Sequence, residues 1–441
     1  MAVVTAFAAD SFVNAVGVNT HSNYGANPTN AYGGNWLPLV SQLGIRHVRE
    51  TYSPGSLLQQ TSLATLASEG VGITLALGGG QTSVSSINAN LTSLVNSSLP
   101  TPEGVEGWNE HDSAGASWAS EVQTFQPTLY GQIKSRWPSA NVLGASLIDN
   151  TRQSQVGSLS AYTDVNNVHA YEPPAQTTEY APLFAPTQSG LYTTQATGKP
   201  LWITETGLVN GSLSDPATLT SELSAARLIP RTLLYTWAPT TLTTVAGSPY
   251  PTGTGGLGAA KTFIYELLDE HNPTEYSPAT EDRFGLFNKD LTPKLAASAL
   301  GNLISLLNDP GTAFTPGTLD VTVTGGGAPF SYILFQKRDG SFWLAYWMGD
   351  PTVNDPLTAQ SPDMADAVTP ITFTFGQTFQ GATVYRPLSG TAVVQHASAI
   401  NSIVVNARLD VQILKLAGQA KPGSRPRGIR SYYDSRSNSL G

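Results

Sequence analysis

Two short segments with strand-like composition each deliver a glutamate near their C-terminal end. Residues 106–111 have the sequence EGWNEH and contain Glu110, and residues 200–207 have the sequence PLWITETG and contain Glu205. Two carboxylates held on rigid strands are suited to cleavage of a glycosidic bond. One carboxyl is kept protonated and donates to the leaving oxygen, while the other stays ionised and attacks the anomeric carbon. The pair therefore favours a carbohydrate-active enzyme.

The elements that would carry these carboxylates alternate along the first two thirds of the chain. Between residues 10 and 307, short β-rich segments alternate with helical stretches, which is typical of parallel β/α architecture. A doubly wound open sheet is the structural competitor, but residues 19–22 (NTHS) after the first predicted strand are not a glycine-rich phosphate loop. The predicted strands number eight, as in a (β/α)8 TIM barrel, and comprise residues 15–19, 45–50, 73–77, 104–108, 141–145, 167–169, 201–204 and 262–267.

The pattern changes after residue 307. Short, often alternating segments separated by Gly, Pro and Asp predict an antiparallel β-sandwich. We therefore expect a catalytic barrel over residues 10–307, a β-sandwich accessory domain over 308–417 and a basic flexible tail over 418–441. A cell-wall-binding arm is the alternative interpretation of this tail, whose basic residues are Lys421, Arg425, Arg427, Arg430 and Arg436.

The bulk composition narrows the classes of function. Charged residues make up 12% of the 441 residues, against about 25% in an average soluble protein. The net charge of −9 argues against a nucleic-acid partner, and the absence of cysteine excludes disulfides and thiolate metal sites. No run approaches the roughly 18 apolar residues of a membrane span, so none is expected. Neutral, hydroxyl-rich surfaces are common on exported proteins that handle sugars, and we expect a secreted, mature chain.

In a (β/α)8 barrel the reacting groups lie at the C-terminal ends of the strands. Glu110 follows the fourth predicted strand and Glu205 the seventh, on opposite sides of the ring, so the two can face each other across its mouth. In this order and placement, residues 109–110 (NE) and 204–207 (TETG) resemble the motifs of the retaining glycoside hydrolases of clan A. The resemblance implies that Glu110 is the acid/base, with a raised pKa, that Glu205 is the nucleophile, and that Asn109 binds the substrate 2-hydroxyl.

Further residues enter through the same resemblance. In residues 168–171 (VHAY), Tyr171 resembles the clan's tyrosine that hydrogen-bonds the nucleophile, and His169 would line the cleft beside it. Arg49 resembles the arginine after strand two that keeps the nucleophile ionised. Residues 17–21 (GVNTH), 44–49 (GIRHVR) and 284–287 (FGLF) look like glycoside hydrolase family 39 and its bacterial polysaccharide-cleaving relatives, which places His21 in the site. The alternatives are a structural histidine at position 169 and a structural salt bridge of Arg49 to Glu50 or another acid.

The last predicted strand departs from the clan pattern. Clan members often place a tryptophan at its end, whereas residues 263–267 read FIYEL here. Glu266 would then contact a polar substrate or be the buried partner of an arginine. Trp237, which precedes a loop rich in Thr, Gly and Pro at 239–258, is the best candidate for stacking on a sugar.

A metal centre is the remaining alternative for the histidines. His21, His111 and His169 lack tight ligand spacing and have no cysteine to support them, so we expect neither a metal nor a cofactor.

The sequence thus predicts a retaining glycoside hydrolase that acts on a poly- or oligosaccharide by double displacement. Three alternatives stay open: a transglycosylase that uses the same site, a non-catalytic polysaccharide-binding surface protein, and a structural or adhesive surface protein. The motifs do not specify the sugar, its linkage or the oligomeric state.

Overall fold

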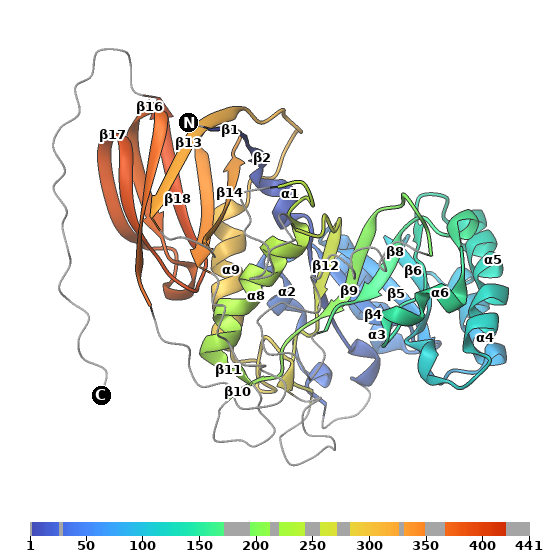
Figure 1. Cartoon of the computed structure of the whole chain (residues 1–441). Coiled ribbons are helices and arrows are strands. Elements are labelled where there is room, and N and C mark those ends of the chain that lie inside the picture. Colours follow the sequence, from blue (N-terminus) through green and yellow to red (C-terminus); the bar gives the residue numbers. More distant parts are fainter. Residues whose placement is uncertain are drawn as a thin grey trace.

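The computed structural model describes residues 2–25, 30–171, 195–211, 220–242, 256–270, 283–325, 330–348 and 367–419. Figure 1 shows a barrel of strands and helices with a mostly antiparallel sheet beside it. The predicted tail at 418–441 lies outside the described residues, except that positions 418 and 419 end strand β18 (Gln412–Gln419). Within the described ranges, no helix has the length and apolar character needed to cross a membrane.

The barrel is a parallel sheet of eight described strands in the spatial order β7-β6-β5-β4-β3-β12-β9-β8. The two ends of this sheet meet through a bridge between Leu143 and Val165, next to which the Gly144 N–H donates to the Val165 carbonyl at 2.9 Å. The ring is thereby closed, and the eight predicted strands are confirmed. Their bounds are β3 (Val16–Asn19), β4 (His47–Thr51), β5 (Gly72–Gly79), β6 (Gly104–Asn109), β7 (Asn141–Val142), β8 (Asn166–His169), β9 (Leu201–Thr206) and β12 (Lys261–Ile264).

Helices between the strands cover the outside of the barrel (Figure 1). Several of them begin at a serine: Ser56, Ser83 and Ser221 each accept a hydrogen bond from the backbone N–H three residues further on. One ends at Gly44, whose φ of 72° is the left-handed conformation that glycine adopts easily. The helices are α1 (Ala9–Val13), α2 (Leu37–Leu43), α3 (Leu57–Ser68), α4 (Val84–Val95), α5 (Trp118–Arg136), α6 (Gln153–Val156), α8 (Glu222–Trp237) and α9 (Leu295–Leu307).

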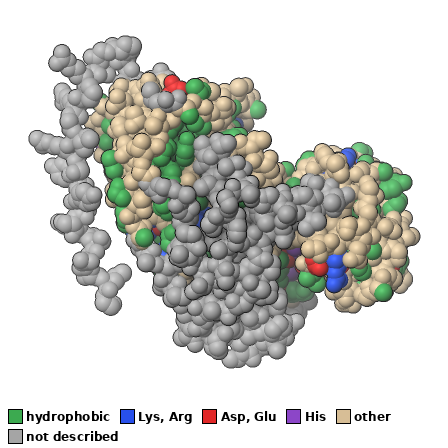
Figure 2. Space-filling view, viewed as in Figure 1, with side chains coloured by type: hydrophobic (Ala, Val, Ile, Leu, Met, Phe, Trp, Pro, Cys, Tyr) green, Lys and Arg blue, Asp and Glu red, His purple; other side chains and the backbone are tan. Residues whose placement is uncertain are grey.

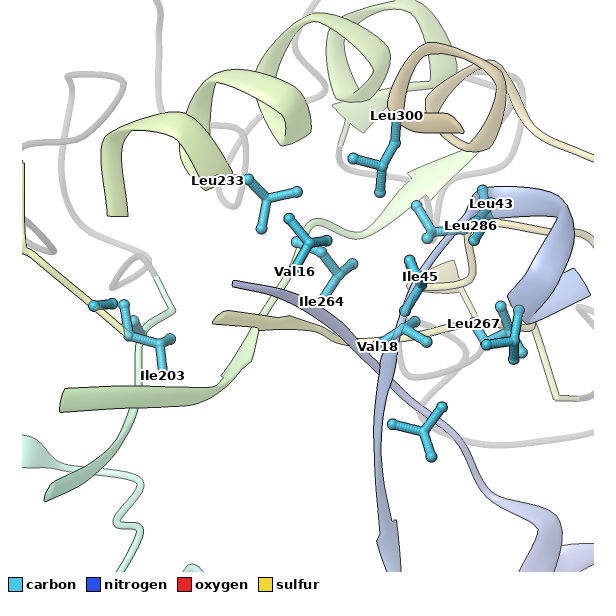
Figure 3. Packing of buried hydrophobic residues seen from close by; sticks show 14 of the residues in the cluster. Val16, Val18, Leu43, Ile45, Ile203, Leu233, Ile264, Leu267, Leu286 and Leu300 are labelled. Atoms are coloured by element: carbon cyan, nitrogen blue, oxygen red, sulfur yellow. The ribbon is translucent and has the colours of Figure 1, made fainter. Parts of the chain in front are cut away.

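A large apolar core fills the space between the barrel and its helices. Figure 3 shows Val16 and Ile264, from the neighbouring strands β3 and β12, near Leu233 of α8 and Leu300 of α9. All four side chains are buried. The strands and the helices both present apolar faces, and the burial of these faces against each other stabilises the ring of strands.

The inside of the ring is layered. Towards the N-terminal ends of the strands lies a small apolar cluster that includes Trp202 and Phe263. Gly17 belongs to this layer, since a Cβ at its position would lie 2.4 Å from Cδ1 of Phe263. Towards the C-terminal ends the interior is polar and includes the fully buried side chains of Thr204 and Glu106. Charge also occurs at the opposite end, where Lys261 begins β12 and pairs with Glu103 at 3.0 Å, but the buried Glu106 and Glu205 lie towards the end where the site is expected.

The second sheet has eight described strands in the order β1-β13-β16-β18-β15-β14-β2, with β17 paired to β16. The predicted strands at 371–375 and 383–385 are parts of one long strand, β16, which contains a register shift. The sheet encloses its own apolar core, which confirms the predicted antiparallel β-module. Its C-terminal strands are β13 (Thr318–Gly325), β14 (Phe330–Gln336), β15 (Phe342–Met348), β16 (Thr369–Tyr385), β17 (Val393–Ala407) and β18.

The first residues of the chain complete this second sheet. Strand β1 (Ala2–Thr5) pairs with β13, and β2 (Phe7–Ala8) pairs with β14. The sequence analysis left these residues outside both modules, because no local pattern indicates pairing between segments so far apart in the chain. On the face shown in Figure 2, neutral polar and apolar atoms dominate the described surface and charged side chains are sparse.

Candidate active site

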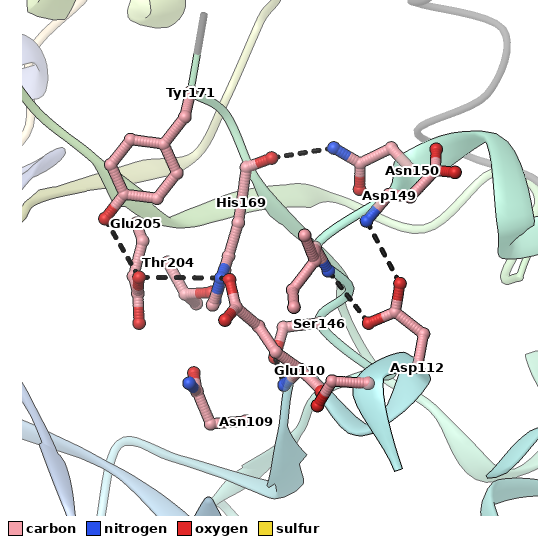
Figure 4. Close-up of polar contacts among 12 residues, drawn as sticks. Asn109, Glu110, Asp112, Ser146, Asp149, Asn150, His169, Tyr171, Thr204 and Glu205 are labelled. Atoms are coloured by element: carbon pink, nitrogen blue, oxygen red, sulfur yellow. Dashed lines mark hydrogen bonds and ion pairs between the residues drawn. The ribbon is translucent and has the colours of Figure 1, made fainter. Parts of the chain in front are cut away.

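Asn109 ends strand β6, and Glu110 follows it at the C-terminal mouth of the barrel. Glu110 has φ 57° and ψ 49°, a left-handed conformation that is uncommon for a residue other than glycine. Ser113 supports this turn, since its N–H and hydroxyl donate to the Glu110 carbonyl at 3.3 and 2.9 Å. The turn ends the strand and directs the Glu110 side chain towards His169 (Figure 4).

Glu205 lies within β9, where a β-bulge sets its direction. Two steps along β9, from Ile203 to Glu205, oppose the single step from Val168 to His169 in β8, and the pairing with β12 shifts at the same level. Thr204, the intervening residue, donates its hydroxyl to Asn167 inside the barrel. Because a bulge re-aims side chains, Glu205 as well as Thr204 reaches partners inside the barrel: Arg49 and Tyr171 donate to its two carboxylate oxygens.

Arg49 of β4 is the cation around which the site is arranged. Its Nη1 donates to Glu205 Oε1 at 2.6 Å and to Asn19 Oδ1 at 3.0 Å. Its Nε donates to Glu106 Oε1 at 2.5 Å, and its Nη2 donates to Asn109 Oδ1 at 2.6 Å. Burial disfavours the guanidinium charge, but Glu106 and Glu205 more than offset this effect and raise the pKa of Arg49. Arg49 is therefore a permanent positive charge beside Glu205.

Of the salt bridges considered as alternatives for Arg49, the one with another acid is formed, with Glu106, and the one with Glu50 is not. Glu50 instead accepts from the hydroxyls of Thr20 and Ser22, at 2.8 and 3.0 Å, and from the side chain of Gln59 at 3.2 Å. Burial raises the pKa of Glu50 to about 7 in spite of these donors. Glu50 thus supports the loop after β3 rather than the site.

Glu106 is a residue of the site that the sequence analysis missed. It is 0% exposed on β6, and it accepts from Arg49 with one oxygen and from Asn167 with the other. A charged residue inside a buried strand must be paired, because desolvation is costly otherwise. A glutamate at position 106, inside a segment predicted to be a buried strand, was therefore the feature of the sequence that could have indicated this role.

His169, the last residue of β8, lies between the two carboxylates (Figure 4). Its Nδ1 is 2.7 Å from Glu110 Oε1 and 3.5 Å from Glu205 Oε2. One side-chain nitrogen or oxygen of each of these three residues lies within 4.8 Å of the others. Tyr171 completes the group, since its hydroxyl donates to Glu205 Oε2 at 2.9 Å. The structure therefore brings together four predicted site residues from three strand ends.

The contact between Glu110 and His169 changes the pKa values of both. Burial acts to raise the pKa of Glu110, but the hydrogen bond and charge of His169 outweigh it and leave this pKa below its usual value. Burial acts to lower the pKa of His169, but Glu205 and Glu110 outweigh it and raise this pKa above 6.5. The raised pKa expected for Glu110 alone is thus wrong. The two carboxylates instead favour the protonated form of His169, and His169 favours the ionised form of Glu110.

His21 and Glu266 lie on neighbouring strand ends of the same mouth. His21 follows β3 and Glu266 follows β12, and His21 Nε2 is 3.4 Å from Glu266 Oε2. Within the described ranges no arginine pairs with Glu266, so that alternative is not formed.

Tyr265 is a second residue that the sequence analysis missed. Its ring centroid lies 5.5 Å from that of His21 and 6.4 Å from that of Tyr171. It is half-buried at the end of the last barrel strand, where the resemblance led us to expect a tryptophan. The tyrosine in the sequence FIYEL, at the end of the last predicted strand, could have indicated this aromatic residue of the site.

Trp237 is not part of this site. It ends α8, and its ring packs edge-on against Phe7 and Phe12, with centroids 5.2 and 6.0 Å apart, and against Phe335 at 5.3 Å. This aromatic cluster joins the barrel to the second sheet, which corrects the assignment of Trp237 as a sugar-stacking residue. Of the loop at 239–258, positions 243–255 lie outside the described residues.

The architecture has a counterpart among solved structures. A family 39 glycoside hydrolase from the gut symbiont Bacteroides cellulosilyticus WH2 matches over 93% of this chain and 82% of its own, with a TM-score of 0.51 and 13% identity. The chain has the fold of a clan A glycoside hydrolase. At this identity the likeness concerns the fold alone.

Other matches are weaker. A family 2 β-galacturonidase from Eisenbergiella tayi matches over 68% of this chain and 52% of its own, with a TM-score of 0.49 and 14% identity. A putative β-galactosidase from Bacteroides fragilis matches over 93% of this chain and 56% of its own, with a TM-score of 0.48 and 10% identity. No protein-family model matches the chain, and no curated protein matches it either.

Proposed function

We propose that the protein is a retaining glycoside hydrolase that cleaves a poly- or oligosaccharide, with Glu205 as nucleophile and Glu110 as acid/base. One observation carries the proposal: the two carboxylates meet at His169, with one atom of each residue within 4.8 Å of the others. Carboxyl groups lie about 5–5.5 Å apart in retaining enzymes, whereas inverting enzymes need about 6.5–9.5 Å to admit a water molecule. The clan A fold supports the same function.

Glu205 is prepared for attack on the anomeric carbon. The Arg49 guanidinium binds Oε1 at 2.6 Å and supplies a buried positive charge beside this side chain. Burial and the neighbouring Glu205 raise the pKa of Tyr171 well above 10, so its hydroxyl remains a donor to Oε2. Attack forms a bond from a Glu205 oxygen to the anomeric carbon as the bond to the leaving oxygen breaks.

Glu110 and His169 handle the proton together. As the glycosidic bond breaks, the proton of His169 passes to Glu110 along their 2.7 Å contact while Glu110 donates a proton to the leaving oxygen, which leaves His169 neutral and Glu110 a carboxylate. In the second step the Glu110 carboxylate accepts a proton from water. The resulting hydroxide adds to the anomeric carbon and releases Glu205.

Asn109 is positioned to recognise the reacting sugar. Its Oδ1 accepts from Arg49 at 2.6 Å, which fixes the orientation of the amide. Its Nδ2 is then left as a donor at the mouth, and no described group accepts from it. A hydrogen bond from this amide to the 2-hydroxyl would strengthen in the transition state.

The test is a screen over glycans and oligosaccharides, with reducing-sugar and mass-spectrometric detection. The proteins are the wild type, Glu205→Gln, Glu110→Gln and the control Glu121→Gln, which alters a carboxylate on α5 outside the site. We expect the wild type and the control to cleave the same substrate and Glu205→Gln to be inactive. Proton NMR of the first product should show the anomer of the substrate, because double displacement retains configuration.

A synthetic glycoside with an activated leaving group separates the two roles. Such a leaving group needs no proton, so Glu110→Gln should regain its first step on it while Glu205→Gln should not. Equal activity of the wild type and Glu205→Gln would refute the assignment of the nucleophile. Transfer of the glycosyl group to a sugar in place of water would indicate a transglycosylase, and glycan binding without cleavage a binding protein.

A further inference from the structure

A second group of one histidine and two carboxylates lies at the same mouth. His21 Nε2 is 3.4 Å from Glu266 Oε2 and 3.9 Å from Glu270 Oε1, and these three atoms all lie within 4.8 Å of one another. His21 follows β3, and the two glutamates follow β12. Since β12 pairs with both β3 and β9, this group lies beside the end of the strand that carries Glu205.

Among the residues that the structure describes, none donates a hydrogen bond to Glu266. It is 0% exposed, and neither carboxylate oxygen has a hydrogen-bond partner; the two ring nitrogens of His21 have none either. The other buried glutamates at this mouth differ, because Glu50 and Glu106 are each held by several protein donors. A buried carboxylate without a partner is costly, so this one calls for a proton or a cation.

The Glu110–His169–Glu205 group differs from the His21–Glu266–Glu270 group in the cation beside its carboxylates. That group has Arg49 as its cation, whereas no described lysine or arginine pairs with Glu266. The nearby Lys294 is committed to Asp269, at 2.8 Å. The two groups thus have the same composition, but among the described residues a cationic side chain binds Glu205 and none binds Glu266.

The surroundings of His21 favour an organic cation. Its ring stacks on Tyr24 with centroids 5.1 Å apart, and it meets Tyr32 and Tyr265 edge-on at 6.1 and 5.5 Å. Tyrosine rings together with carboxylates are a common environment for ammonium groups. Burial lowers the pKa of His21 to about 4, so the ring is neutral and can accept a hydrogen bond from such a group.

We propose that His21, Glu266 and Glu270 form an ammonium subsite that binds the protonated amine of an amino sugar in the barrel mouth. The proposal rests on the proposed function only for the claim that the ligand is a sugar. Because the subsite lies beside the strand end that carries Glu205, a sugar bound at Glu205 would have this subsite as its neighbour. A sugar carboxylate at the same position would meet the negative charges of the subsite and be disfavoured.

The test measures binding alone, so its outcome does not depend on hydrolysis. Saturation-transfer NMR titrations would compare glucose, glucuronate and the three glucose analogues with an amine at carbon 2, 4 or 6, at pH 6 where the amines are protonated. Manganese(II) chloride is a further probe, since histidine and carboxylates also bind metal ions. The proteins are the wild type, Glu266→Gln and the matched control Glu50→Gln, a buried glutamate with its own donors.

We expect at least one amino analogue to bind the wild type and Glu50→Gln about tenfold more tightly than glucose, and this preference to vanish in Glu266→Gln. Thermal unfolding of each variant would verify that it is folded. Equal binding of glucose and all amino analogues would overturn the proposal. Binding of manganese without any preference for an amine would overturn it too and would indicate a metal site. Loss of hydrolysis alone would concern Glu110 and Glu205, not this subsite.

Discussion

Replacement of Arg49 by methionine removes the buried cation while keeping the length of the aliphatic stem. Arg49 is 4% exposed and holds two buried carboxylates, those of Glu106 and Glu205, at 2.5 and 2.6 Å. Removing one partner of a buried ion pair costs about 3–5 kcal/mol, because it leaves an uncompensated charge. Asn19 and Asn109 also lose a charged donor. These contributions are not additive, and we expect the free energy of unfolding to fall by about 5 kcal/mol.

The matched control is the same substitution at Arg46. This residue binds Asp10 at 2.7 and 2.9 Å, but the two side chains are 26% and 20% exposed. Solvent screens such a pair, so Arg46→Met should cost about 1 kcal/mol or less. Urea unfolding followed by tryptophan fluorescence would measure both variants. Arg49→Lys keeps the positive charge but loses the planar set of guanidinium donors. Its loss of unfolding free energy should lie between those of Arg49→Met and Arg46→Met.

The comparison has a clear refuting result. If Arg49→Met lowers the unfolding free energy no more than Arg46→Met does, then the site is not organised around a buried guanidinium. If Arg49→Met does not fold, the intermediate variant decides: an Arg49→Lys protein as stable as the wild type would refute the reasoning equally.

Three further predictions concern the proton, the junction and a close backbone contact. In His169→Asn the basic limb of the pH profile of kcat/KM should move to lower pH. Glu110 then holds the proton alone, and a carboxyl has a reference pKa about two units below that of imidazole. An unchanged basic limb would show that His169 does not share this proton. Trp237→Ala should lower the unfolding free energy by about 3–5 kcal/mol and leave KM unchanged. The ring is packed at the junction of the barrel and the second sheet and not at the mouth of the barrel. A raised KM would contradict this placement. Gly207→Ala should cost about 1–3 kcal/mol and reduce kcat, since its Cβ would lie 2.0 Å from the Tyr265 carbonyl oxygen; a neutral result in unfolding and turnover assays would contradict the crowding.

Much of the architecture was determined by the sequence alone. The eight barrel strands could be predicted in order, because each is a short run of buried residues bounded by helix caps and glycines, and these are local signals. The positions of Glu110 and Glu205 at strand ends followed from the same pattern, since the polarity of a parallel barrel sends every strand end to one mouth. The antiparallel module after residue 307 was indicated by short segments in which apolar and polar residues often alternate.

Other features were decided only by the tertiary structure, because they depend on segments that meet across the fold. The bulge that aims Glu205 depends on pairing with both neighbouring strands. The contact of His169 with Glu110 and the packing of Trp237 against Phe7 join residues that are 59 or more positions apart in the chain. The group of His21, Glu266 and Glu270 joins the first barrel strand to the last. Local composition limits what a residue can do, but its pKa and its partners are set by burial and by neighbours that only ring closure supplies.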